Sequence, residues 1–441
     1  KGGKMLRLIK SILVISLFLV SQTVFAQDIS SWAENIKSKH GGTKIVAAVA
    51  SHPSVESFKK MIPKFEQLTG IDVVLDEMEE GQLGQKLTLE VSSGVTNYDL
   101  AMVSIERNPK VSNAKYTVPL ENFFNDKSKT PSWFNYGDIL PAYSDMFLWK
   151  GEHYAIPFAG ETVFLFHRKD IFEKYNLTVP KTYAEVLNTA AFFDNNEKGV
   201  DGMSFRVRLG WEFTYTWSIF LFPFGGQMID PVTGKPNLNT PGTRYSLNYM
   251  SQLAKHAPPG VESYSFPEAW DAFMLGKTAM MIEASAAAPE IENPEKSLVA
   301  GKVGYSSMPA GPAGAFSGCW GWGLAVTSAS KHKEAAWAFI MYMTSMGMQD
   351  EYLANGGIPS RTSSLGNKSL WGKFPYYKAT LETLKQAEAL GEKGHSVVIR
   401  IPEWGQFSEM LGTDGARAFI GEIPVDQAVI GMQKQAEKIL K

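Results

Sequence analysis

Two tryptophans stand between glycines in residues 318–323, Gly-Cys-Trp-Gly-Trp-Gly, at the start of an apolar run. Glycine weakens a strand, and an indole ring needs both packing and a partner for its N–H. Such a composition is favoured in a loop whose flat rings bind something. We therefore expect Trp320 and Trp322 to face a ligand; the alternative is that either ring fills the core.

A second group of polar and aromatic side chains is too dense for a plain core segment: Arg206, Arg208, Trp211, Glu212, Tyr215 and Trp217. A carboxylate, Glu283, also ends the apolar run 280–282. Aromatic faces pack on the C–H faces of sugars, and carboxylates and guanidiniums bind hydroxyls through charge-assisted hydrogen bonds. These residue types suit a ligand with many hydroxyls.

Catalytic and metal motifs are incomplete in this chain. Gly276-Lys277-Thr278 resembles the tail of a phosphate loop, but Asp271 stands where the first glycine is needed. Residues 194–199 resemble the start of a calcium loop, yet Lys198 and Phe205 occupy two ligand positions. No pattern places a nucleophile, a base and an orienting group together. We expect no enzymatic activity, no cofactor and no metal site.

The composition is that of a well-packed protein, with 44% hydrophobic residues and a net charge of −2. This balance provides no electrostatic footprint for nucleic acid or for an anionic membrane surface. Cys319 is the single cysteine, so no disulfide forms within the chain. The length exceeds one comfortable core, which favours two domains.

The first residues predict export. Lys4, Arg7 and Lys10 precede a short apolar stretch at 11–20, and Val24-Phe25-Ala26 offers small residues to a signal peptidase. The stretch is too short for a stable membrane helix. We therefore expect a signal peptide over residues 1–26. Because Gln27 follows, no cysteine is available there for a lipid anchor, and a periplasmic location without a lipid anchor is expected.

Strands and helices alternate in the first part of the mature chain. Strands are predicted at 43–49, 71–75 and 98–103, with a helix kinked at Pro63 between the first two and another around 83–91. This order is typical of a doubly wound parallel sheet, in which ligands lie beyond the carboxyl ends of strands. His52 and Glu106 follow two of those ends and become site candidates; the alternative is that both are exposed loop residues.

A second series of elements begins near residue 160. Strands are predicted at 161–166, 280–283 and 303–309, and helices at 170–175, 181–193 and within 402–441. Thr182 and Glu185 have the spacing of a capping box. Trp404, which follows Pro402-Glu403, is expected in the core, and the alternative is that its ring reaches the cleft.

Several segments in order resemble the extracellular solute-binding proteins (family 1 type) that serve carbohydrate ABC importers. They are 155–158, 166–172, 272–281, 303–309, 330–340 and 357–361. Residues 206–211, 224–226 and 258–260 look most like the branch that includes sugar-alcohol binders. The resemblance covers nearly the whole mature chain.

The resemblance implies an α/β fold of the two-lobed periplasmic binding protein type (type II-like), each lobe a doubly wound sheet flanked by helices. Lobe I would comprise residues 27–156 plus 310–360, and lobe II residues 157–309 plus 361–441. Hinge crossings would fall near 156–161, 307–316 and 357–362. A sugar or sugar alcohol would be trapped between the lobes and delivered to the membrane permease subunits of an ABC importer by a monomer.

The resemblance also assigns roles to particular residues. Trp320 and Trp322 would form an aromatic platform, faced by Trp211 from the other lobe, for which core packing is the alternative. Arg206 and Arg361 would bind ligand oxygens. The alternative for Arg206 is a surface ion pair, and the alternative for Arg361 is an interlobe salt bridge. Glu161 at the first crossing and Glu283 would accept hydrogen bonds from ligand hydroxyls. The alternative is that both carboxylates stabilise the hinge or cap an element.

Two other functions stay open from the sequence. A periplasmic glycoside hydrolase would need two carboxylates across a bond, for which Glu161 and Glu283 are the available pair. A chemoreceptor-docking sugar sensor would share the binding lobes and differ only in its partner.

Overall fold

A computed structural model of the chain describes residues 29–371 and 373–441. The predicted signal peptide, residues 1–26, lies outside the described residues. Among the described residues, no helix combines the length and the apolar character that crossing a bilayer requires.

Three parallel strands form the first part of the sheet, in the order β2-β1-β3. The predicted alternation of strands and helices is confirmed, with one correction. The expected kinked helix is two helices, because Pro63 lies in the first turn of the second helix, where proline is tolerated. The bounds are β1 (Lys44–Ala50), α2 (Pro53–Lys59), α3 (Ile62–Thr69), β2 (Asp72–Met78), α4 (Glu80–Ser93) and β3 (Leu100–Ser104).

The two glycine-flanked tryptophans lie in a strand, β10 (Cys319–Val326), and not in the expected loop. β10 runs antiparallel between β3 and β6 (Ile156–Arg168). Successive side chains of a strand point to opposite faces, so Trp320 and Trp322 share one face. The glycines allow close packing on the other face, since a Cβ at Gly323 would lie 2.8 Å from the Cβ of Ala155.

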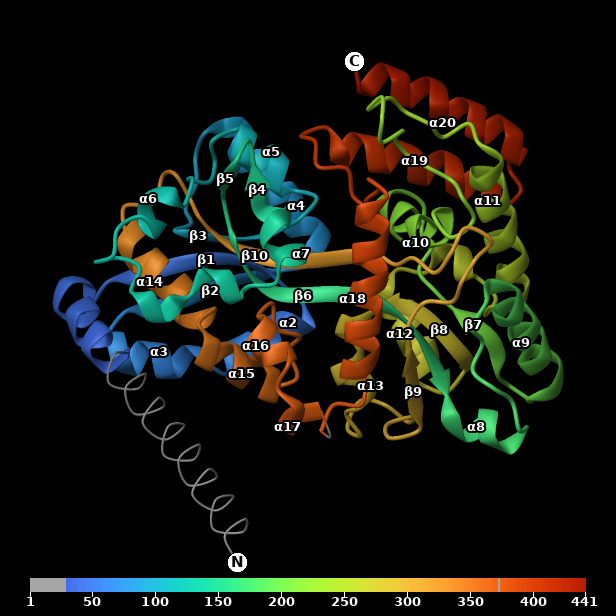
Figure 1. The fold of residues 1–441 in the computed structure, drawn as a ribbon, viewed down its shortest axis with the longest axis horizontal. Coiled ribbons are helices and arrows are strands. Elements are labelled where there is room, and N and C mark those ends of the chain that lie inside the picture. The colour runs from blue at the N-terminus through green and yellow to red at the C-terminus, as the bar shows by residue number, and fades with distance from the viewer. Residues whose placement is uncertain (1–28, 372) are drawn as a thin grey trace, which may run out of the picture.

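Strand β6 connects the two parts of the molecule (Figure 1). Its residues Ile156 to Thr162 pair with β10, and from Val163 onward it pairs with β8 (Thr278–Ala284) and β9 (Val303–Ser306). β7 (Asp201–Ser204) lies parallel to β8 at the far edge. The first predicted crossing, residues 156–161, therefore lies inside one continuous strand.

Helices surround both halves of this sheet and produce two lobes (Figure 1). On the side of β7 and β8 lie α8 (Lys169–Lys174), α9 (Tyr183–Asn196), α10 (Trp211–Leu221), α11 (Pro241–Leu253), α12 (Phe266–Met274), α13 (Ala288–Ile291), α19 (Trp404–Phe419) and α20 (Val425–Ile439). The predicted capping box of Thr182 and Glu185 opens α9 and is confirmed.

The remaining helices pack mainly around the first lobe, and α18 stands between the two groups (Figure 1). They are α5 (Asn108–Asn113), α6 (Glu121–Phe124), α7 (Pro141–Ser144), α14 (Lys333–Met343), α15 (Met346–Ala354), α16 (Thr362–Leu365), α17 (Lys368–Trp371) and α18 (Tyr377–Glu392). The short strands β4 (Leu148–Trp149) and β5 (Glu152–His153) form a separate hairpin. α14 is buried along its length from Ala335, so it forms the centre of the first lobe's core.

The second predicted crossing, residues 307–316, is hydrogen-bonded to α18 and to the start of α9. The side-chain amide of Gln386 on α18 brackets Met308, accepting its N–H at 3.0 Å and donating to its carbonyl at 2.8 Å. Ala310 exchanges backbone hydrogen bonds with the start of α9. This segment therefore touches the second lobe before the chain returns to β10.

Candidate ligand-binding site

A cavity of about 210 Å³ lies between the two lobes. Seven of the nine predicted site residues line it: His52, Glu106, Glu161, Arg206, Trp211, Trp320 and Trp322. The other two, Glu283 and Arg361, do not. Direct ligand contact by any of the seven stays a prediction.

The carboxyl ends of the parallel strands supply the first lobe's side of the cavity. His52 follows β1, and Ser104 and Glu106 lie at the end of β3. Glu80, two residues beyond β2, joins them from the first turn of α4. The arrangement follows the general rule that open α/β sheets bind ligands beyond these strand ends.

The two tryptophans of β10 contact partners of different origin. The ring of Trp320 lies 4.5 Å from the ring of Tyr215 on α10, in the second lobe. The ring of Trp322 lies 5.7 Å from the imidazole of His52. Both indoles are largely buried while lining the cavity, so they pack against protein on one side and are available to a ligand on the other.

Arg206 is held by a bidentate pair with Glu283 on β8. Its Nε and Nη2 donate to the two carboxylate oxygens at 2.8 and 2.5 Å, and its guanidinium lies 4.0 Å from the ring centre of Tyr215. Burial alone would lower the pKa of Arg206, but the adjacent Glu283 carboxylate raises it, so the group stays cationic.

Glu283 is therefore not positioned to accept ligand hydroxyls. It is fully buried, and its Oε1 also accepts the backbone N–H of Ala284 at 2.6 Å. Its carboxylate fixes the guanidinium of Arg206, which in turn lines the cavity. The predicted role of Glu283 as a direct acceptor is replaced by one of positioning.

Glu161 and His52 form a buried, uncharged contact at the cavity floor. Nδ1 of His52 accepts the N–H of Ser54, which leaves the proton on Nε2, 3.4 Å from Oε1 of Glu161. Burial, with the nearby charge of Arg206, lowers the pKa of His52 to about 3. Burial, with the neighbouring carboxylate of Glu80, raises the pKa of Glu161 to about 8. Both groups are neutral at pH 7.

The Oε1 atom of Glu161 has no hydrogen-bond partner within the part of the chain that the structure describes. The side chain is only 7% exposed. A buried polar atom without a partner costs about 1–3 kcal/mol. A ligand hydroxyl that reached this oxygen would remove that cost.

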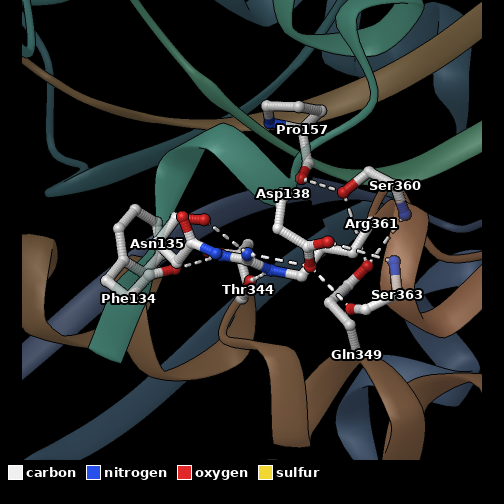
Figure 2. A network of polar contacts seen from close by, with 9 residues as sticks. All are labelled: Phe134, Asn135, Asp138, Pro157, Thr344, Gln349, Ser360, Arg361 and Ser363. Atoms are coloured by element: carbon white, nitrogen blue, oxygen red, sulfur yellow. Dashed lines mark hydrogen bonds and ion pairs between the residues drawn. The ribbon is translucent and has the colours of Figure 1, made fainter. Parts of the chain in front are cut away.

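Arg361 does not line the cavity. It lies in a network of polar contacts of its own (Figure 2). Its guanidinium donates to the carbonyls of Phe134, Asn135 and Thr344 at 2.6–2.8 Å, and Nη1 lies 3.4 Å from Oδ2 of Asp138. The side chain is fully buried. The prediction that Arg361 binds ligand is replaced by a structural role, because first-lobe carbonyls already occupy its donors.

The third predicted crossing is fastened by the same network (Figure 2). Ser360 donates to the carbonyl of Pro157 at 2.7 Å, and its own N–H donates to the side chain of Gln349. The Gln349 amide also donates to Phe158. These hydrogen bonds hold residues 357–362 against the start of β6. The predicted lobe II segment 361–441 begins at Arg361, and the contacts of Arg361 place that first residue against the first lobe.

The sequence did not single out Glu80, Phe266 and Trp270, which line the cavity, and it named Tyr215 and Trp404 without assigning them a binding role. Tyr215 lies four residues after Trp211 on α10, and this spacing places both on one helix face. Glu80 follows a third strand end, where the rule that identified His52 and Glu106 also applies. Trp404 has both of the positions considered for it, since it is buried, packs on Phe407 and also lines the cavity.

The arrangement supports binding more directly than bond cleavage. Aromatic rings, the fixed guanidinium of Arg206 and several carboxyl side chains, Glu161 among them, line a cavity between two lobes joined by a strand. Within residues 29–371 and 373–441, no three His, Cys, Asp or Glu side chains are placed to hold a metal ion. Fold and site together define a two-lobed binding protein with its ligand cavity between the lobes.

Comparison with known proteins assigns the family. Residues 50–350 match the model of the bacterial extracellular solute-binding protein family. The chain belongs to this family.

Individual relatives extend over most of the chain. It is 26% identical over 383 residues to a mannitol-binding protein of Pseudomonas aeruginosa, covering 82% of this chain and 85% of that protein. An ABC transporter solute-binding protein from Agrobacterium radiobacter K84, solved with ribitol, is 28% identical with a TM-score of 0.82, covering 90% and 99%. One from Agrobacterium vitis S4, with bound D-mannitol, is 28% identical with a TM-score of 0.80, covering 90% and 98%.

Proposed function

We propose that this protein captures a sugar alcohol between its two lobes and presents it to the permease of an ABC importer. The observation that carries the proposal is the cavity floor, where the unpartnered oxygen of Glu161 lies beside aromatic rings from both lobes. An acyclic polyol offers both of the surfaces that such a site needs, C–H faces for the rings and hydroxyls for the polar atoms.

The neutral carboxyl of Glu161 favours a hydroxyl over a charged group. A protonated carboxyl both donates and accepts, and so does a hydroxyl. A site that pairs each hydroxyl rejects analogues lacking one, because its own buried groups would stay unpaired. The names of the mannitol-binding relative and of the ribitol and D-mannitol complexes support the same ligand class.

The proposed location is the periplasm, and the proposed partners are membrane permease subunits that meet the closed protein. The predicted signal peptide and the extracellular family support this location. We propose that the protein acts as a monomer with the predicted hinge crossings, and that the last segment of lobe II begins after Arg361, whose guanidinium is bound by first-lobe carbonyls.

A thermal-shift screen over sugars and sugar alcohols tests the ligand class. A ligand that binds only the folded state at a hundredfold excess over Kd adds about 2.7 kcal/mol of stability. We expect the largest shift from an acyclic polyol. A shift confined to cyclic sugars, or to none of the panel, would reject the sugar-alcohol proposal.

The same sample tests the enzymatic alternative. Glycoside hydrolysis would require two carboxylates facing the bond, and Glu283 is already paired with Arg206. We expect no release of reducing sugar from labelled oligosaccharides. Hydrolysis of an oligosaccharide, together with a melting temperature that no free sugar or polyol changes, would favour the hydrolase.

A further inference from the structure

A second hollow, of about 320 Å³, lies beside the main cavity. The two hollows share three lining residues: His52 after β1, and Phe266 and Trp270 on α12. Beyond these shared residues the second hollow is lined by α2 of the first lobe and by α12 and α13 of the second. It is therefore an interlobe groove that begins where the main cavity ends.

We propose that this groove is an outer subsite for a neutral sugar unit, so that the ligand includes sugar alcohols carrying a glycosyl group. The inference rests on the proposed function, since the polyol part would occupy the main cavity. It extends that function by naming a larger ligand class.

The shared wall has the chemistry of a carbohydrate platform. The rings of Phe266 and Trp270 lie 5.2 Å apart at 57°, and both line both hollows. Trp270 is 5% exposed, and its indole N–H has no acceptor among the residues that the structure describes. A buried indole N–H normally has a partner. A ligand hydroxyl at the junction of the two hollows would supply one.

The rim of the groove favours a neutral unit over an anionic one. Glu56 on α2, Asp271 on α12 and Glu290 on α13 contribute three carboxylates. Two of them are paired with lysines, Glu56 with Lys59 at 2.7 Å and Glu290 with Lys296 at 3.2 Å, so the rim keeps a small excess of negative charge. Carboxylates accept hydrogen bonds from hydroxyls, and the excess charge disfavours a phosphate or carboxylate on the ligand.

Both lobes contribute to the groove, as they do to the main cavity. Glu56 on α2 belongs to the first lobe and Asp271 on α12 to the second, and both line the groove. A sugar unit bound there would touch both lobes and would add to the free energy that favours closure. A glycosylated polyol would therefore bind at least as tightly as the bare polyol.

Matched ligand pairs test the inference by calorimetric titration of the full mature chain. The pairs are D-glucitol with maltitol, and D-mannitol with glucosyl-mannitol. We expect the glycosylated member of at least one pair to bind as tightly as its parent or more tightly. If both glycosylated ligands bind more than about tenfold weaker than their parents, the outer subsite is rejected while the proposed function stands. If no member of either pair binds, the inference falls, and failure of the full polyol panel would reject the proposed function as well.

Asp271→Trp supplies the matched variant, because an exposed residue on α12 then fills the groove. We expect the glycosylated ligand to lose about tenfold or more in affinity and the parent polyol to bind unchanged. Asp271→Asn, which keeps the size of the side chain, is the control, and melting temperatures verify folding of both. Equal losses for both ligands, or no loss for either, would overturn the inference.

Discussion

At the scale of single residues, the site depends on a carboxyl held without charge. Glu161 lies on β6, the strand that joins the lobes, and is buried beside His52. Burial and the carboxylate of Glu80 raise the pKa of Glu161 to about 8. A neutral acid at this position can donate to one ligand oxygen and accept from another. Protonation of Glu161 thus relieves its repulsion by the neighbouring carboxylate of Glu80.

The raised pKa of Glu161 predicts a pH trend in stability that Glu161→Gln removes. The ordinary value is 4.5 and the folded value about 8, so between them the folded state binds more protons than the unfolded state. Raising the pH therefore destabilises the wild type relative to the glutamine variant, by up to about 1.4 kcal/mol per pH unit. Denaturant unfolding of the ligand-free proteins at pH 5.5, 6.5 and 7.5 (roughly spanning the interval) measures the difference.

Glu388→Gln, at an exposed position on α18, is the control and should keep a constant difference from wild type across the same pH range. A constant difference for Glu161→Gln as well would show that Glu161 ionises as an exposed acid does.

The two indoles of β10 should each contribute to affinity. We expect Trp320→Ala and Trp322→Ala to weaken polyol binding about tenfold to hundredfold, equivalent to about 1.4–2.7 kcal/mol, because each removes a stacking face. Trp320→Ala should have the larger effect, since its ring also contacts Tyr215 across the lobes. Titration calorimetry measures both, with Trp149→Ala on β4 as the control; unchanged affinity in both variants would assign the rings to the core alone.

At the scale of elements, local patterns predicted most of the fold. Apolar runs located β1 and β3, alternation located β2, apolar spacing located α4, and a capping-box spacing located α9. The strand-end rule found His52 and Glu106. The same rule, applied after β2, would have found Glu80.

Other features depended on contacts that no local pattern encodes. The segment 318–323 was expected to be a loop because glycines weaken strands, yet the close approach of Phe147 and Ala155 requires glycine at Gly323. Arg361 was expected at the ligand from the family resemblance. Its real acceptors are carbonyls of Phe134 and Asn135, more than two hundred positions away in sequence.

The network around Arg361 predicts a variant that affects stability and spares binding. Arg361→Lys keeps the charge, but lysine lacks the planar guanidinium that reaches three carbonyls at once. We therefore expect a loss of about 2–4 kcal/mol in the free energy of unfolding. Polyol affinity should stay within about twofold of wild type. Denaturant unfolding measures the stability and calorimetry the affinity. A large loss of affinity in a fully stable variant would show that Arg361 binds the ligand.

At the scale of the whole molecule, the ligand and the hinge act on one equilibrium. Trp320 of the first lobe meets Tyr215 of the second, and Arg400 donates to the carbonyl of Asp145 at 2.5 Å, joining residues just before α19 to the first lobe. We expect these contacts to favour a closed arrangement, and we expect a ligand between the lobes to shift the population further toward it.

Closure predicts a change of shape on binding. Small-angle X-ray scattering of the mature chain should give a smaller radius of gyration with saturating polyol than without it. Trp320→Ala should need a higher polyol concentration for the same change. An identical scattering curve with and without a polyol that calorimetry shows to be bound would mean that binding does not close the lobes.

The most direct test of the central claim is the equilibrium affinity of the purified mature chain for acyclic polyols, measured by titration calorimetry with D-mannitol, ribitol, D-glucitol and erythritol. We predict saturable binding at one site for at least one of them, with a Kd near micromolar, or about −8 kcal/mol. Absence of saturable binding for all four at millimolar concentrations would contradict the claim that the cavity floored by Glu161 is a sugar-alcohol site.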